Sequence, residues 1–389
     1  MRWASAFTAQ AETVAAAHEV SDSLVEQLGP EPVDLAIAFF MANHVPAASP
    51  LADTLKERLR PRCLVGASAH GVISSDHEIE SGPGLTVLAA RLPGVELSPF
   101  VLTNEAWQAA LDDPLEFARM TPGAADSHLV VLLADPFTFD IERCLEAFNR
   151  HAAGLPLAGG MASAGPRPGS NALLLNDWVA QEGGVAVALK GALRVDVVVS
   201  QGCRPIGPAL QVTRAEGNVV FELDGQPALE RTEQVLRDLS EQERAYLKSG
   251  LYVGRQVRAG AEGQGDYLIR NLLGADRQRG LLAVGDQVED KERIRFHVRD
   301  AQTARQDLEL LLAPQEFDSR ARGALLFACN GRGQGLFGEP DCDIATLQAA
   351  LGGGISIAGM FCAGEIGPVG PRNLLHGHTA SIAIVRAEG

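Results

Sequence analysis

One stretch near the C-terminus concentrates polar side chains between two apolar segments. It covers residues 359–378 and lies between segments 355–358 and 379–385. The side chains in it that can bind or react are those of Cys362, Glu365, Arg372, Asn373, His376 and His378. Glycine and proline are frequent here, and both favour turns over helices and strand ladders. We therefore expect a loop held by two buried strands, which is where binding and catalytic groups tend to lie.

Glu365 is the acidic residue of this stretch and stands between Gly364 and Gly367. A carboxylate in such a loop can hold the ammonium group of an amino acid through charge-assisted hydrogen bonds. It can also act as a general base if burial raises its pKa. The structural alternative is a carboxylate that only accepts backbone N–H groups in turns. The residue types alone leave these roles open.

His376 and His378 are separated by a single glycine. In an extended segment their side chains would point to the same face, and with Cys362 and Glu365 they could form a zinc site. However, the spacing matches no established zinc pattern, and the intervening glycine favours a turn. We therefore predict no metal site and expect both histidines to be structural or to contact a ligand.

A second glycine-rich segment covers residues 331–338 and follows a predicted strand. Its glycines have the spacing of a dinucleotide-binding fingerprint. Against nucleotide binding, the next helix begins only after the glycines, and Asp341 and Asp343 at its start would repel an anion. We expect the glycines to let the backbone approach a ligand or another loop, with Arg332 able to bind a carboxylate through two hydrogen bonds.

Three cysteines, Cys203, Cys329 and Cys362, lie where apolar segments give way to predicted loops. A reactive thiol needs a lowered pKa, which Arg204 could provide for Cys203. Buried, unreactive cysteines are the more common case, and we favour that interpretation. No nucleophile elbow or triad motif is present, which argues against a hydrolase. An enzyme that uses Glu365 with a cysteine or histidine is therefore kept only as an alternative hypothesis.

Polar residues at the ends of other predicted strands are further candidates. They are Arg270, Asn271, Arg299 and Asn330. Arg299 and Asp300 could equally be the end of a strand and the N-cap of the next helix.

The composition of the chain bounds its class. A length of 389 residues suggests two or three domains, and 46% hydrophobic residues are enough for full cores. The net charge of −16 argues against nucleic acid and anionic membrane surfaces as partners. The first residues lack an unbroken apolar core, so we expect no signal peptide. The six cysteines include no C-x-x-C pair, so we expect reduced thiols and a cytoplasmic location.

A pattern of strand, helix, short strand, glycine loop and strand recurs three times. The strands are expected at 33–40, 63–65 and 85–92, then at 128–134, 155–158 and 185–189, then at 324–328, 355–358 and 379–385. The helices are expected at 50–59, 140–151 and 341–351. The glycines Gly66, Gly159 and Gly359 follow Leu35, Leu129 and Leu325 by 31, 30 and 34 residues. We predict three β-α-β-β units, each with a parallel pair and an antiparallel third strand.

The middle of the chain has a different pattern. Strands are expected at 194–200, 209–214 and 219–223, interrupted by a loop at 201–208, and later at 267–271, 280–284 and 294–298. Helices are expected at 227–239, at 241–248 and after Asp300. We place a domain boundary near residue 224. The prediction is a mixed α/β fold with domains 1–224 and 225–389, built from mixed sheets packed with helices.

Several short motifs resemble the FIST sensory domain family when they are taken in order. They are VGASAHGVIS, LPLAGGMASAG, FELDGQPALE, YLIRNLLG, CNGRGQGLF and AGMFCAGEIGPVG. The resemblance covers nearly the whole chain. It implies an N-terminal and a C-terminal FIST domain that sense small ligands, amino acids among them. It also implies a downstream signalling protein as partner and a stand-alone cytoplasmic sensory unit here.

The resemblance favours a ligand role for Glu365, which would hold the cationic end of the ligand while Arg332 or Arg299 holds its carboxylate. The full set of ligand-binding candidates is Glu365, Arg332, Asn330, Cys362, His376, His378, Arg299, Asn271, Gly159 and Gly160.

The cofactor is left open by the sequence. Some members of the family resembled are haem-based nitric-oxide sensors, so a haem protein is an alternative hypothesis. An axial ligand is then needed, and the available histidines are His70, His297, His376 and His378.

Overall fold

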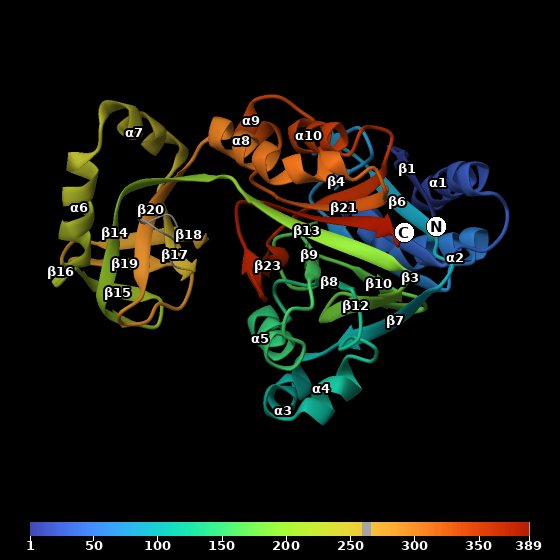
Figure 1. Ribbon diagram of the computed structural model, residues 1–389, viewed down its shortest axis with the longest axis horizontal. Helices are drawn as coiled ribbons and strands as arrows, with labels where there is room; N and C mark the ends of the chain where they lie inside the picture. Colours follow the sequence, from blue (N-terminus) through green and yellow to red (C-terminus); the bar gives the residue numbers. More distant parts are fainter. Residues whose placement is uncertain (259–265, 389) are drawn as a thin grey trace. The chain divides into compact units, whose positions relative to one another are not determined.

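A computed structural model of the protein describes residues 1–258 and 266–388. The chain forms two compact units (Figure 1). The first consists of Met1–Ser200, Leu308–Leu375 and Thr379–Gly389, and the second of Gln201–Asp307 and His376–His378. The second unit is therefore an insertion in the first. In the described part of the chain, no helix is long and apolar enough to cross a membrane.

The first repeat of the first unit contains the predicted parallel pair. Strands β2 (Leu35–Met41) and β3 (Cys63–Ala69) are parallel and are joined by η1 (Ala42–Ala47) and α2 (Ala48–Leu59). Strand β6 (Leu85–Arg91) returns antiparallel to β2, and β1 (Arg2–Thr8) pairs with β6 at the edge. Helix α1 (Thr13–Leu28) connects β1 to β2. Glu12 caps α1 by accepting hydrogen bonds from two backbone N–H groups.

The second repeat has the same order. Strands β8 (Leu129–Ala134) and β9 (Leu157–Met161) are parallel, with α5 (Ile141–His151) between them. Strands β12 (Gly184–Gly191) and β7 (Val95–Leu102) complete the antiparallel part. Three short helices, η2 (Asn104–Ala106), α3 (Trp107–Asp112) and α4 (Pro114–Met120), follow β7.

The third repeat is divided by the second unit. Its parallel strands are β21 (Ala321–Cys329) and β22 (Ser356–Cys362), joined by α9 (Gln334–Phe337) and α10 (Cys342–Ala350). Strand β25 (Thr379–Ala387) lies antiparallel to β21, and β13 (Leu193–Gln201) is the edge strand. Helix α8 (Ala301–Leu312) and η5 (Ala313–Phe317) precede β21. The three predicted units are thus present with the predicted strand directions.

Each sheet is completed by a hairpin from another repeat. The hairpin β10–β11 (Leu173–Leu175, Trp178–Ala180) of the second repeat pairs with β3 of the first. The hairpin β23–β24 (Glu365–Val369, Arg372–His376) of the third repeat pairs with β9 of the second. The hairpin β4–β5 (Val72–Ile73, Glu78–Ile79) of the first repeat pairs with β22 of the third. This cyclic exchange makes three six-stranded sheets.

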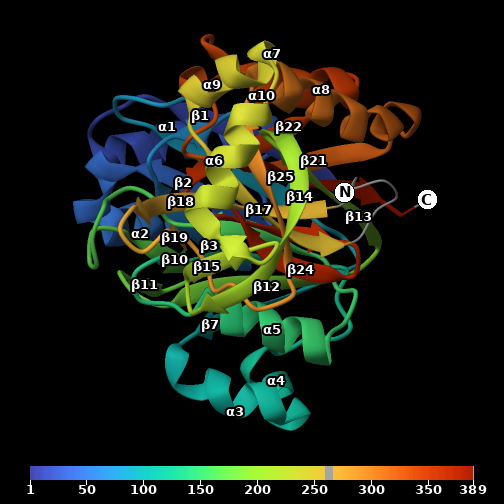
Figure 2. The same cartoon turned by 90° about the vertical axis from the view of Figure 1, so that its left-hand side faces the viewer.

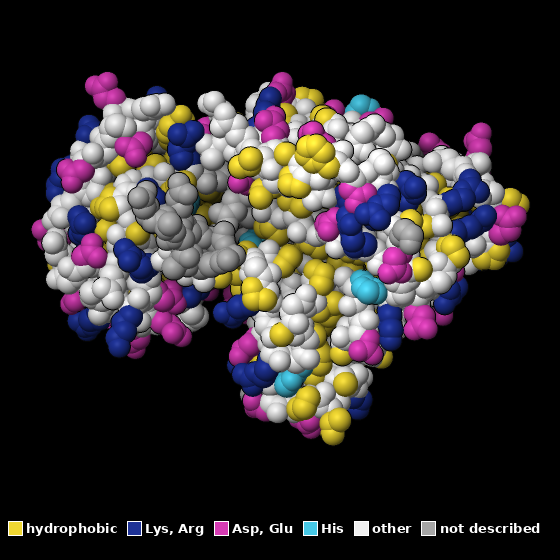
Figure 3. All heavy atoms as spheres, viewed as in Figure 1, with side chains coloured by type: hydrophobic (Ala, Val, Ile, Leu, Met, Phe, Trp, Pro, Cys, Tyr) yellow, Lys and Arg dark blue, Asp and Glu magenta, His cyan; other side chains and the backbone are white. Residues whose placement is uncertain are grey.

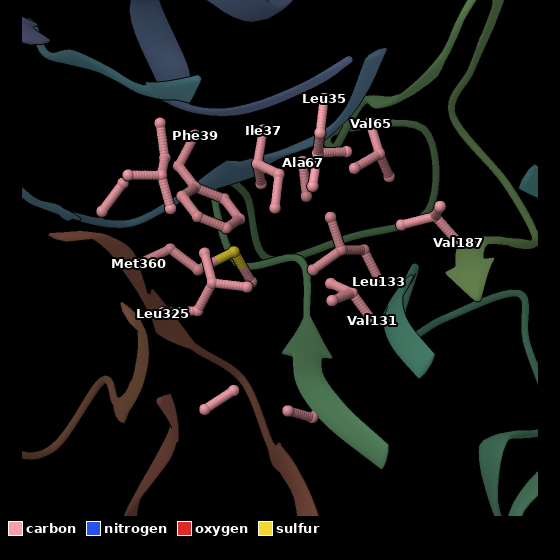
Figure 4. Close-up of a cluster of buried hydrophobic side chains, with 14 of the residues drawn as sticks. Leu35, Ile37, Phe39, Val65, Ala67, Val131, Leu133, Val187, Leu325 and Met360 are labelled. Atoms are coloured by element: carbon pink, nitrogen blue, oxygen red, sulfur yellow. The ribbon is translucent and has the colours of Figure 1, made fainter. Parts of the chain in front are cut away.

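The three sheets share one core. A single cluster of buried side chains takes Phe39 from the first repeat, Leu133 from the second and Leu325 from the third (Figure 4). The opposite face of each sheet packs against the helices of its own repeat (Figure 1). Both faces are therefore buried, which explains why the strands have nearly continuous apolar sequences.

The stretch 359–378 is not the loop that we predicted. Its first residues end β22, and the remainder forms the hairpin β23–β24. The hairpin turns at Gly370, whose φ of 58° suits glycine. Strand β24 is at the edge of its sheet, and Pro371 lies in the turn before it, so that proline removes no ladder hydrogen bond from the sheet interior.

The second unit is a barrel. Its strands are β14 (Cys203–Glu216), β15 (Val219–Leu223), β16 (Gln226–Pro227), β17 (Tyr252–Arg258), β18 (Asp266–Asp276), β19 (Leu281–Val284) and β20 (Arg293–Arg299). Pairing runs β14–β20–β17–β18–β19–β15 and returns to β14, which closes the ring. Helix α6 (Ala228–Asp238) packs on β14, β15 and β19 and is followed by α7 (Glu241–Tyr246) and η3 (Leu247–Ser249) (Figure 2).

The loop expected at 201–208 is wrong as well. Strand β14 begins at Cys203 and pairs with β20 from Cys203 to Ile206 despite Pro205. The register shifts between Ile206 and Leu210, where Gly207 has a φ of 58°. A bulge therefore absorbs the glycine and prolines, while the strand continues.

Candidate functional site

The carboxyl ends of the three parallel pairs meet inside the first unit. Backbone hydrogen bonds link each neighbouring pair of repeats there, among them Ser68 N–H to Ala172 O (2.9 Å), Met161 N–H to Gly364 O (2.8 Å) and Phe361 N–H to Gly71 O (2.9 Å). We call this ring of contacts the repeat junction. Carboxyl ends of parallel strands are where open α/β sheets bind ligands.

Ser163 holds the repeat junction together. Its N–H donates to Ser68 O (3.1 Å), and its hydroxyl donates to Phe361 O (2.5 Å) and accepts from His70 N–H (2.8 Å). A single side chain thus contacts all three repeats.

The pairing registers identify equivalent positions in the three repeats. The first residue of each exchanged hairpin is Val72, Leu173 or Glu365, and each pairs with the residue that follows the loop glycine of its sheet. Val72 and Leu173 belong to the shared apolar core. Glu365 is also completely buried, but carries a carboxyl group. Since burying a carboxyl group is costly, Glu365 is the candidate functional residue among the three equivalent positions.

The Glu365 carboxyl group is only partly satisfied. Its Oε2 accepts hydrogen bonds from Thr379 N–H (3.1 Å) and from the Thr379 hydroxyl (2.8 Å). Its Oε1 has no hydrogen bond of ordinary geometry within the described residues, although the Cys329 side chain interacts with the group. Burial raises the pKa of Glu365 to about 8, against the opposing effects of Thr379, Arg332 and Cys329.

The predicted residues Gly160 and Cys362 pack directly beside Glu365. Gly160 is the register partner of Glu365, and a Cβ atom at Gly160 would lie 2.4 Å from Cys362 Sγ. Burial, together with the nearby Glu365 and Cys329, raises the pKa of the Cys362 thiol well above its usual range. Gly159 lies one residue away, in the same strand. The structure therefore brings these four predicted residues together.

Arg332 is buried and ion-paired. Its Nε and Nη2 donate to the two carboxylate oxygens of Asp343 at 2.6 and 2.7 Å, and its ring contact is Phe337. Its Nη1 has no partner in the part of the chain that is described. Burial alone would lower the pKa of Arg332, but the charges of Asp343, Cys329 and Glu365 raise it.

A second buried carboxyl group, that of Glu78, lies near Asp343 of this ion pair. Glu78 accepts a hydrogen bond from Ile344 N–H (2.9 Å), and its backbone N–H donates to Asp341 (2.6 Å). Burial and the nearby Asp343 raise the pKa of Glu78 to about 7. Asn330, another candidate, is exposed, and its N–H donates to Cys362 O (2.9 Å).

The remaining candidates lie in the second unit. His378 Nε2 is 3.2 Å from Asn271 Oδ1, and its ring packs on Tyr252 at 4.5 Å between centroids. Burial and the charges of Arg299 and Arg270 lower the pKa of His378 to about 4. His376 is buried at the end of β24. The chain thus places its candidates in two groups, one in each unit.

Asp300 has the structural role that we considered. Strand β20 ends at Arg299, and Asp300 accepts a hydrogen bond from Thr303 N–H (3.2 Å) in the first turn of α8. Asp300 also pairs with Arg204 at 2.9 Å.

Haem is the cofactor that the sequence left open, and its possible axial ligands have defined places in the fold. No group of three histidine, cysteine or carboxylate side chains that could hold a metal is found among the described residues. His297 is packed against Tyr267 and bonded to Arg295 O (3.0 Å), which holds the ring in the wall of the barrel. Grooves of 360, 640 and 730 Å³ in the first unit are not lined by His70, His297, His376 or His378. We derive no step through haem.

Several residues of the site escaped the sequence analysis. Ser163 and Glu78 act through contacts with other repeats, so local sequence gave no reason to select them. Thr379 contacts Glu365 of its own repeat, across the hairpin that was predicted to be a loop. Asp343 was noticed only as an obstacle to nucleotide binding. Asp343 follows Arg332 after a glycine turn and lies in the first turn of a helix. This placement is the one signal that could have indicated an ion pair.

Comparison with known proteins gives close relatives and distant structures. The uncharacterized protein Mb0898c of Mycobacterium bovis is 40% identical over 375 residues, and Rv0628c of Mycobacterium tuberculosis is 39% identical over 376, each alignment covering 95% of both chains. Among solved structures, a cyanuric acid hydrolase from A. caulinodans matches over 100% of both chains with a TM-score of 0.35 and 10% identity. Likeness at that level does not extend to function.

The family models match most of the chain. The FIST N domain matches residues 34–226 and the FIST C domain residues 228–368. The compact units divide the chain differently, at Ser200 and Leu308, because the barrel draws strands from both matches. With both domain models matched in order and relatives alike over nearly their full length, the chain belongs to the FIST family.

Proposed function

We propose that this FIST protein is a sensory protein for a small zwitterionic ligand of the amino-acid class, with Glu365 as the ammonium site. FIST domains are sensory domains of signal transduction, which sets the general class. The observation that carries the ligand chemistry is the buried Glu365 carboxyl group with its unpartnered Oε1.

A cationic ligand would remove the main cost of burying Glu365. An unpaired buried acceptor costs about 1–3 kcal/mol, and a charged one costs more. Thr379 donates to Oε2, and the Cys329 side chain is a weak donor beside the carboxyl group. An ammonium group has three donors and the opposite charge, so it complements the carboxylate oxygen that is left without a hydrogen bond.

Arg332 supplies a complementary group for the other end of the ligand. Two of its nitrogens are occupied by Asp343, and Nη1 is the unpartnered one. The charge of Arg332 favours the ionised form of Glu365, and the charge of Glu365 favours the charged form of Arg332, as expected for the two ends of one site. Asp343 would then orient the guanidinium group, and the carboxylate of the ligand would accept from Nη1.

The alternative of a cysteine enzyme is less well supported. A nucleophilic thiol must ionise readily. The pKa of Cys362 is raised instead, because the thiol is buried and lies near Glu365. A buried acid beside a neutral thiol favours binding over covalent chemistry.

Signalling would follow from a ligand-shifted equilibrium. A ligand shifts a conformational equilibrium only if it binds the two states with different affinities. A cationic ligand that binds the carboxylate form of Glu365 gives such a difference, because the cost of that buried charge depends on how tightly the three repeats enclose it. We propose a cytoplasmic protein that passes this change to a separate signalling partner. Acidic and basic side chains are interspersed on the face shown in Figure 3.

The test is a thermal-shift and calorimetric screen with free amino acids, monoamines and small monocarboxylates. A ligand at 100 times its Kd adds about 2.7 kcal/mol to the state that it binds. We expect amino acids to stabilise the wild type and Glu365→Gln to abolish that effect. Glu78→Gln is the matched control, because Glu78 is also buried, also has a raised pKa and also has an unpartnered oxygen. Equal stabilisation of wild type and Glu365→Gln would overturn the assignment of the site.

A further inference from the structure

Two cysteines end neighbouring parallel strands at the repeat junction. Cys329 is the last residue of β21, Cys362 is the last residue of β22, and the two are register partners. Their side chains therefore project from the same face of the sheet. Both are thiols in the structure; Cys362 is buried and Cys329 is half-buried.

This arrangement suits a disulfide bond. Neighbouring strands lie ~4.8 Å apart, and the two Cα atoms of a disulfide are usually about 4.4–6.8 Å apart. The absence of a side chain at Gly160 leaves the space that Cys362 Sγ occupies, because a Cβ atom there would lie 2.4 Å from that sulfur.

The pair is specific to the third repeat. Gly66, Gly159 and Gly359 are equivalent, because each packs on a carbonyl oxygen of the adjacent first strand. Counting three residues on from each gives Ala69, Ala162 and Cys362. Two repeats thus have alanine where the third has a thiol, and the core does not require sulfur at this position.

We propose that Cys329 and Cys362 form a reversible disulfide bond by exchange with a low-molecular-weight disulfide. The Cys329 sulfur, as the more exposed of the two, bonds to one sulfur of the small disulfide and releases the other half as a thiol. The Cys362 sulfur then displaces the second half. Two electrons and two protons pass from the cysteine pair to the small disulfide, which leaves as two thiols.

The disulfide would change the environment of Glu365. The Cys329 side chain interacts with the Glu365 carboxyl group and helps to hold its negative charge. A disulfide has no S–H donor, so the charged form of Glu365 loses this support. Ammonium binding would then weaken on oxidation. This consequence rests on the proposed function, whereas the disulfide itself does not.

The test uses the full chain with Cys342→Ser. Trypsin cleavage after Arg322, Arg332 and Arg372 would otherwise give one peptide with both Cys342 and Cys362. The protein is equilibrated in glutathione buffers from reducing to oxidising, quenched with N-ethylmaleimide, digested and analysed by mass spectrometry without reduction. We expect peptides 323–332 and 333–372 to appear linked under oxidising conditions and to separate on reduction.

Cys362→Ala in the same background is the matched control, because alanine occupies the two equivalent positions. It should fold normally, lose the linked peptide and carry glutathione or N-ethylmaleimide on Cys329. Two separately alkylated peptides at every glutathione ratio, or glutathione on Cys329 without a link, would overturn the proposal. A linked peptide with unchanged amino-acid binding would refute only the effect on Glu365. A linked peptide in a protein that binds no amino acid would refute only the proposed function.

Discussion

Among the individual residues, Glu365 is expected to make the stability of the protein depend on pH, because its protonation is coupled to folding. Burial raises the pKa of Glu365 from 4.5 to about 8 in the folded protein. The folded state therefore binds this proton more tightly than the unfolded state does. The sign follows directly: the favourable contribution is complete below the unfolded pKa and is lost as pH rises toward 8.

We predict that the free energy of unfolding of the wild type, relative to Glu365→Gln, falls between about pH 5 and pH 8 and is level above that range. Chemical denaturation of both proteins at several pH values measures the difference. Glu78, whose pKa is raised to about 7, adds a slope of the same sign to both proteins and cancels. Parallel curves for the two proteins would show that Glu365 is not protonated on burial.

The same titration governs ligand binding. An ammonium group pairs with the carboxylate form of Glu365, which predominates in the ligand-free protein only above about pH 8. We therefore predict that amino-acid affinity increases as pH rises toward 8 and that binding at neutral pH releases a proton. Calorimetry in buffers with different ionisation enthalpies detects that proton. Affinity that is independent of pH over this range would argue against Glu365 as the ammonium site.

At the scale of elements, the contact between β9 and β22 depends on a missing side chain. A Cβ atom at Gly160 would lie 2.4 Å from Cys362 Sγ and 3.1 Å from Gly364 O. We predict that Gly160→Ala destabilises the protein by about 1–3 kcal/mol, which is the usual cost of overpacking a core. In a Cys362→Ala background the first of these clashes disappears, so the cost should be smaller.

A double-mutant cycle by chemical denaturation measures this coupling. Gly154→Ala is a useful reference glycine substitution, because nothing lies within 4 Å of a Cβ atom there, although its φ of 84° is itself unfavourable for alanine. If Gly160→Ala costs the same with and without the Cys362 sulfur, the two positions do not pack as described.

The strands and hairpins of the first unit show which elements could be predicted from the sequence and which could not. Apolar periodicity and the loop glycines predicted the three parallel pairs, because those pairs depend on contacts close in the chain. The hairpin β23–β24 was mistaken for a loop, because its composition is that of a turn and its partner β9 is some 200 residues away. Glu365 and Cys362 are close in the sequence and lie together in the structure, but the contact with Gly160 follows from the exchange of hairpins and has no local signal.

At the scale of the whole molecule, the cyclic exchange makes the first unit a single cooperative structure. Each sheet needs a hairpin from another repeat, and all three sheets contribute to one core. No repeat of the first unit has a complete sheet by itself. A ligand at the repeat junction therefore acts where the three repeats are joined, which is the position from which a local change can reach the whole unit.

The barrel, in contrast to the three repeats, has a complete sheet and core of its own. Its strands close on themselves, and Ile206, Phe296 and Val253 belong to a core that contains only residues of the second unit. Helix α7 has its own capping box, in which Ser240 and Glu243 satisfy each other's backbone N–H groups. The backbone and core contacts that a domain needs are thus present within one continuous segment.

We predict that a fragment of residues 201–300 folds without the rest of the chain. It should show a cooperative unfolding transition in urea and dispersed amide signals in NMR spectra. Phe296→Ala, at the centre of the barrel core, should lower its stability by about 3–5 kcal/mol, whereas Leu273→Ala, at an exposed position, should change it little. A fragment that lacks a transition would mean that the barrel depends on the first unit, and that the two units form one folding domain. A cooperative fragment would show that the barrel, which contains Asn271, folds independently of the first unit, which contains Glu365 and Arg332.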